Sequence, residues 1–104
     1  MNFIKITFNG LPAVGTTISV KDSLNPSLDM FQEFVPFGGA AGDVPNETWI
    51  FSQGSLSAQA SLYRNALSVD YAGTIYTFSL LANTVTISSN NINSFFSIVE
   101  STGV

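Results

Sequence analysis

Strict alternation of apolar and polar side chains is the feature that most limits the folds open to this chain. Within residues 3–8, isoleucine or phenylalanine recurs at every second position, and residues 16–21 do the same with Ile18 and Val20. Successive side chains of a strand point to opposite faces, so a period of two predicts strands with one buried face. Residues 9–15, which contain glycine and proline, lie between the two runs and predict an antiparallel hairpin with a long loop.

The last third of the chain repeats this pattern. Residues 75–81 and 84–88 alternate on either side of a tight turn at Ala82 and Asn83, and residues 95–99 follow as a final strand. We therefore expect a second hairpin and one more strand in this region.

A single segment has a helical period. Residues 55–69 place apolar side chains at helical spacing behind Ser55, a residue type that favours the N-cap position. The apolar positions are Leu56, Ala60, Tyr63 and Leu67. Several strands and one helix predict a mainly β (α+β) fold, either a two-layer antiparallel β-sandwich or a small barrel with the helix packed on it. Residues 1–104 are the length of a single domain.

Residues 22–47 have no clear period, and we expect an irregular arm or long loop there. Pro36 limits any strand over residues 31–37 to a sheet edge. The segment is nevertheless too apolar for a solvated linker, so we expect it to contact the core or a neighbouring subunit. The candidate assembly contacts in it are Leu28, Met30, Phe31, Phe34 and Phe37.

The residue types that the chain lacks exclude several common catalytic mechanisms. There is no cysteine and no histidine, which removes thiolate nucleophiles, cysteine-based metal sites and serine nucleophiles that depend on a histidine base. Most of the seven acidic residues fall in or near expected loops without an evident pair. Solvated charges on turns explain them, so we expect a non-enzymatic protein with no catalytic residue and no cofactor.

Two groups of oxygen-bearing side chains are candidate calcium ligands. The first contains Asp22, Asn25 and Asp29, and the second contains Asp43, Asn46 and Glu47. Neither group has the spacing of a calcium-binding loop, and the turn-forming tendency of these residue types accounts for them. We expect no metal, although a weak calcium site within residues 22–47 stays open as an alternative.

Four aromatic residues offer a second kind of binding site, because exposed rings stack on sugars. They are Trp49, Tyr63, Tyr71 and Tyr76. Tyr63 and Tyr71 extend the apolar stripe of the expected helix, and Trp49 lies in an apolar run. Packing in the core is therefore the expected role of these rings.

Charge is scarce in this chain. Charged residues make up 10%, with three basic and seven acidic side chains and a net charge of −4, whereas about 25% is typical. Three cations do not form a phosphate-binding surface, so we expect no nucleic-acid partner. Residues 71–99 carry no charge, but their serine, threonine and asparagine content excludes a transmembrane helix, and we expect no membrane insertion.

Uncharged strands provide little repulsion between copies of a protein. Soluble β domains protect their sheet edges with lysine, proline or bulges, so we expect the edges built from residues 71–99 to be covered in an assembly. Arg64 is the only arginine. Because arginine is enriched among the residues that dominate interfaces, Arg64 is a further candidate assembly contact.

Residues 61–71, 76–79 and 83–89 (SLYRNALSVDY, YTFS and NTVTISS) resemble a helix-then-hairpin module of bacteriophage structural proteins. The resemblance covers about residues 55–100 and carries over no functional residue. It implies a tail, capsid or decoration component that associates with itself and with other virion proteins. The first ten residues lack a signal-peptide pattern, so we expect synthesis in the host cytoplasm and function in the virion. The alternative is a surface- or carbohydrate-binding β module, adhesin-like, with a sugar receptor.

Overall fold

The computed structural model describes residues 2–36, 46–51 and 54–100. The elements, in chain order, are β1 (Phe3–Thr7), β2 (Thr17–Asp22), β3 (Asn25–Val35), β4 (Glu47–Trp49), α1 (Leu56–Asp70), β5 (Tyr76–Leu81), β6 (Thr84–Ser89) and β7 (Phe96–Glu100). The helix and the strands expected from residue 75 onward lie within one or two residues of their predicted bounds.

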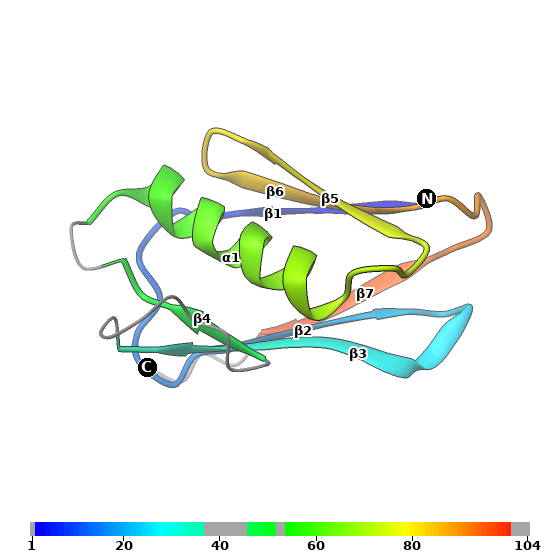
Figure 1. Cartoon of the computed structure of the whole chain (residues 1–104), viewed down its shortest axis with the longest axis horizontal. Coiled ribbons are helices and arrows are strands. Elements are labelled where there is room, and N and C mark those ends of the chain that lie inside the picture. The colour runs from blue at the N-terminus through cyan, green and yellow to red at the C-terminus, as the bar shows by residue number, and fades with distance from the viewer. Residues whose placement is uncertain (1, 37–45, 52–53, 101–104) are drawn as a thin grey trace.

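The strands form two sheets, and α1 lies across both (Figure 1). One sheet has the order β1-β6-β5 and the other β4-β3-β2-β7. All pairs are antiparallel except β3 with β4, which run parallel. The expected mainly β sandwich with one packed helix is therefore confirmed, and the sheets do not close into a barrel.

The predicted hairpin between residues 3–8 and 16–21 is wrong. β1 pairs with β6, and β2 pairs with β3 and β7, so the two runs lie in different sheets. The loop between them crosses from one layer to the other. There the Gly15 N–H donates to Phe34 O at 2.8 Å, which fastens the end of the loop to β3.

The expectation of an irregular segment is also corrected over most of its described part. Asn25–Val35 form β3, the longest strand, with Met30, Gln32 and Phe34 buried at alternate positions. The strand ends before Pro36, as a residue without a backbone N–H requires. Residues 37–45, with the glycine-rich run and Asp43, lie outside the described residues.

The core lies where α1 meets the inner faces of both sheets. Ser55 caps the helix by accepting a hydrogen bond from the Ala58 N–H at 3.3 Å. The Tyr63 ring then packs against Phe8, with ring centroids 5.6 Å apart, and against Phe34, at 6.0 Å. These three rings join the helix, the end of β1 and β3. The other buried apolar side chains are Ile6, Ile18, Val20, Met30, Ala60, Leu67, Tyr71, Tyr76, Val85, Ile87 and Phe96.

Candidate functional site

The strand β7 lies at the end of its sheet and pairs with β2 alone among the described strands. We call its uncovered backbone side, over Phe96–Glu100, the β7 edge. The Ser23 N–H donates to Phe95 O at 2.9 Å, so residue 95 faces β2. Because hydrogen-bonding direction alternates along an antiparallel strand, Ser97 and Val99 also face β2. Phe96, Ile98 and Glu100 therefore direct their N–H and C=O groups to the β7 edge.

Apolar side chains surround the β7 edge. Phe95 is 65% exposed, Val99 70% and Ile98 40%. Glu100 is the one charged residue of the strand. An exposed, apolar strand edge with a single charged residue is a template for pairing with another chain.

Two other strand edges of the described sheets are guarded. β1 carries the exposed Lys5 at its middle. Beside β3, Tyr71 Oη accepts from the Phe31 N–H at 2.9 Å and lies 3.0 Å from Asp29 O, so one phenol occupies the backbone groups that a neighbouring strand would use. The free side of β5 is also uncharged, but Thr77 and Ser79 are exposed along that strand.

The short strand β4 is held by the helix. Gln59 donates from Nε2 to Trp49 O at 2.9 Å and accepts from the Phe51 N–H at Oε1 at 2.7 Å. The buried amide of Gln59 thus acts as a strand partner for β4. The β7 edge has no comparable cover within the described residues.

A buried carboxylate fixes the start of β7. Asp22 is 2% exposed, and its Oδ2 accepts from Tyr76 Oη at 2.8 Å and Ser94 Oγ at 2.7 Å. Its Oδ1 accepts from the backbone N–H groups of Leu24, at 3.1 Å, and Phe95, at 3.2 Å. One side chain therefore joins β2, β5 and the segment that leads into β7.

Two opposing effects set the pKa of the Asp22 carboxyl. Burial raises it, and the hydrogen bonds from Ser94, Tyr76, Leu24 and Phe95 lower it. The hydrogen bonds prevail, so the pKa lies below the ordinary value of 3.8 and the carboxylate is charged at neutral pH. The solvated role expected for Asp22 is wrong, because the network that it completes is built from residues far apart in the chain.

A second polar network lies between α1 and the four-stranded sheet. Asp70 Oδ2 accepts from Gln32 Nε2 at 2.7 Å and from the Asn46 N–H at 2.8 Å. Gln32 in turn accepts from Thr48 Oγ1 at 2.8 Å. These contacts satisfy the buried polar groups of Gln32 and Thr48, which would otherwise oppose folding.

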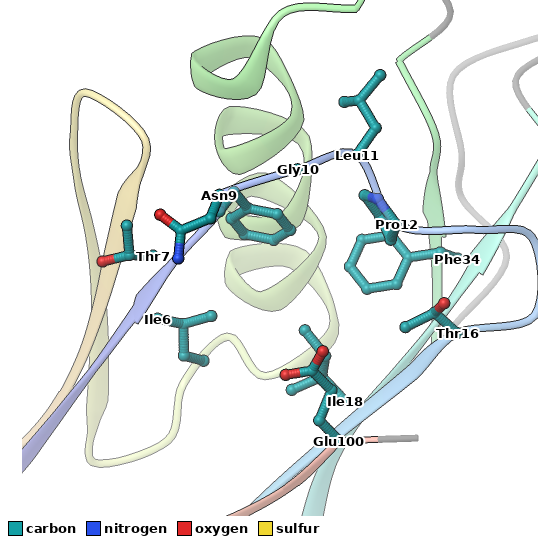
Figure 2. Close-up of a pocket in the computed structure, with 11 residues that line it drawn as sticks. Ile6, Thr7, Asn9, Gly10, Leu11, Pro12, Thr16, Ile18, Phe34 and Glu100 are labelled. Atoms are coloured by element: carbon teal, nitrogen blue, oxygen red, sulfur yellow. The ribbon is translucent and has the colours of Figure 1, made fainter. Parts of the chain in front are cut away.

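A cavity of about 350 Å³ opens beside the C-terminal end of β7 (Figure 2). Ile6, Ile18 and Phe34 line it from the two sheets, and Pro12 and Leu11 border it from the β1–β2 loop. The polar side chains of Thr7, Asn9 and Thr16 complete a mixed lining, in which Glu100 is the one charged residue. One carboxylate does not form a catalytic pair.

The residues expected to make assembly contacts fall into three groups. Met30 and Phe34 are fully buried in the chain's own core, so the expectation is wrong for these two. Both residues lie in β3, and this strand was not predicted from the sequence, which explains the error. Leu28 and Phe31 are half-buried, while Phe37 lies outside the described residues. The exposed apolar residues at the β7 edge, Phe95, Ile98 and Val99, were not among the expected assembly contacts.

Arg64 is half-buried on α1. Its Nε is buried, and no hydrogen-bond partner for this atom exists among the described residues. No described carboxylate was found to pair with the guanidinium, so its expected role as a contact stays a prediction.

The candidate calcium ligands that the structure describes do not form a metal site. No group of three or more acidic side chains that could hold a metal ion occurs in the described parts of the chain. Asp22 already accepts four hydrogen bonds, and Asp29 accepts one from Ser19 Oγ.

The three tyrosines expected in the core are indeed buried there, which confirms that interpretation. Trp49 is half-buried beside a second, smaller hollow. No described helix is long and apolar enough to cross a membrane. Comparison with protein-family models, curated proteins and solved structures gave no match to this chain.

Proposed function

We propose that this protein is a non-enzymatic structural module that assembles with copies of itself and with other virion proteins as a component of a phage particle. The observation that carries the proposal is the β7 edge, where backbone donors and acceptors coincide with exposed apolar side chains and only one charged residue, Glu100. Burying Phe95 and Val99 against a neighbour removes apolar surface from water, which favours association.

The order of elements supports the phage part of the proposal. α1 is followed directly by the paired strands β5 and β6, which is the helix-then-hairpin arrangement of the module that the sequence resembles. The small share of charged residues also favours close packing between like subunits, because few charged side chains would have to be buried or paired at a contact.

Sedimentation velocity over a range of protein concentrations tests the assembly part. We expect the mass to rise with concentration, whereas a strict monomer at every concentration contradicts it. Mass spectrometry of particles purified from the producing cells tests the virion part. The protein should be present in these particles at a fixed ratio to other structural chains.

A second candidate function, binding to sugars, is favoured by one observation. A hollow of about 250 Å³ is lined by Trp49 with Glu47 and Asn65, a ring beside polar side chains that can hydrogen-bond hydroxyl groups. Trp49 is the only tryptophan, so its fluorescence reports on this hollow alone. Saturable quenching by a monosaccharide panel supports sugar binding, and unchanged emission at millimolar sugar contradicts it.

A further inference from the structure

We propose that the β7 edge is the place where two copies of this chain meet, with β7 of one copy antiparallel to β7 of the other and Ile98 on the two-fold axis. This inference rests on the proposed self-assembly and specifies its surface. Pairing there joins the four-stranded sheets of two copies into one continuous sheet.

The hydrogen-bonding pattern of β7 matches itself about its centre. Phe96, Ile98 and Glu100 direct their backbone groups outward, and Ile98 is the middle residue of the strand. With Ile98 on the axis, Ile98 faces Ile98 of the second copy, and Phe96 faces Glu100 of the second copy. Every residue with outward groups therefore faces another, and each facing pair exchanges two hydrogen bonds.

Charge disfavours one of the alternative registers. The two Glu100 side chains lie four residues apart along the paired strands, about 13 Å at 3.3 Å per residue. That separation exceeds the Debye length of about 8 Å at physiological salt, so their repulsion is largely screened. A two-residue shift that places Glu100 opposite Ile98 would bring the carboxylates to about 7 Å and would lose a facing pair.

The side chains agree with the backbone. Val99 would lie opposite Ser97 of the second copy, and the two Ile98 side chains would cover each other. β1 does not offer the same surface, because an exposed lysine at the middle of its edge, Lys5, would face its own copy. A second copy is thus the occupant that the β7 edge fits.

Single cysteines test the register directly, because the chain contains none of its own. Facing residues of a hydrogen-bonded antiparallel pair have Cα atoms about 5.5 Å apart, which suits a disulfide. Ile98→Cys should therefore form an intermolecular disulfide at least tenfold faster than Val99→Cys or Leu81→Cys. Both controls are more exposed than Ile98 in the single chain, so exposure alone predicts the opposite order.

A charge on the axis gives the second measurement. Ile98→Lys should raise the dimer dissociation constant at least tenfold in sedimentation equilibrium, because two like charges would face each other. Leu81→Lys, the same change on an exposed side chain of β5, should leave the constant unchanged. Circular dichroism of each variant checks that the fold is kept. If Ile98→Lys fails to fold, the disulfide rates of the single-cysteine variants still test the register.

The outcomes separate this inference from the proposed function. If copies still associate but Ile98→Cys shows no preference, pairing through β7 is overturned while self-assembly stands. If Ile98→Lys blocks binding to another virion chain and Ile98→Cys does not cross-link, the occupant is that chain and the inference of a second copy is overturned. If the protein stays monomeric at every concentration, both proposals fail.

Discussion

Asp22 shows how much of this fold depends on single polar side chains. Its four accepted hydrogen bonds connect β2 with β5 and with the start of β7. Asp22→Asn should lower the free energy of unfolding by roughly 2–4 kcal/mol, because an amide nitrogen would face donors in place of a charged acceptor. Urea denaturation measures this, and the exposed Asp29→Asn is the matched control, for which we expect little change. Equal losses in the two variants would contradict the structural role of Asp22.

From the lowered pKa of the Asp22 carboxyl we also predict that the stability of the fold depends on pH in the acid range. Its pKa is lower in the folded chain than the ordinary value of 3.8. Its contribution to stability is therefore fully present above that ordinary value and is lost as the pH falls through the lower, folded value. Thermal unfolding between pH 6 and pH 2 should show a decline below about pH 4. The decline should be smaller in Asp22→Asn, and an identical profile for both proteins would exclude this cause.

For Tyr63 we predict a substitution that raises the free energy of unfolding. Its hydroxyl is buried without a hydrogen-bond partner among the described residues, and burial, with a smaller effect of Tyr71, raises the pKa of the phenol. Tyr63→Phe removes a desolvated polar group and keeps the ring packing. The free energy of unfolding should rise by about 1 kcal/mol. A clear loss in urea denaturation would mean that the hydroxyl has a partner after all.

Among the elements, α1 and β4 depend on each other through Gln59. Gln59→Leu would remove the acceptor of the Phe51 N–H and the donor to Trp49 O, so the free energy of unfolding should fall by roughly 2–4 kcal/mol. Amide exchange at Phe51 should accelerate at the same time. Asn65→Leu, which also replaces a side-chain amide with leucine but at an exposed helical position, should alter neither quantity.

Elements defined by local periodicity were predictable from the sequence, and elements defined by distant partners were not. The helix stripe and the alternation of residues 75–88 depend on neighbours in the chain. β3 was missed because Gln32 interrupts its apolar face, and the partners that satisfy Gln32, Thr48 and Asp70, lie 16 and 38 residues away. The pairing of β1 was misassigned for the same reason.

The candidate site was only partly predictable. The uncharged run of residues 71–99 marks the region that contains β7. β7 lies at the end of its sheet because it pairs with β2 alone, while Tyr71, Gln59 and Lys5 protect the edges of β3, β4 and β1. Both facts are properties of the folded chain. Phe95, Ile98 and Val99 read in sequence as ordinary strand residues.

At the scale of the whole molecule, the tyrosines predict how the protein unfolds in alkali. Tyr63, Tyr71 and Tyr76 are all buried, and their phenol pKa values are raised above 10.0, with Tyr76 at about 12. Stability from these neutral phenols is fully present below their unfolded value and is lost as the pH rises through the folded value. Ultraviolet absorbance should show the tyrosines ionising together with loss of the fold, between about pH 10 and pH 12. Ionisation of any tyrosine near pH 10 with the fold intact would contradict this.

The pairing of β1 with β6 also has a consequence for folding during synthesis of the protein. Thr7 and Thr84 face each other in the sheet although 77 residues separate them. At typical rates of about 5–20 residues per second, a ribosome needs roughly 4–15 s to synthesise that interval. Throughout this time the apolar face of β1, with Ile4, Ile6 and Phe8, has no native strand beside it and is open to non-native contacts until β6 has been synthesised.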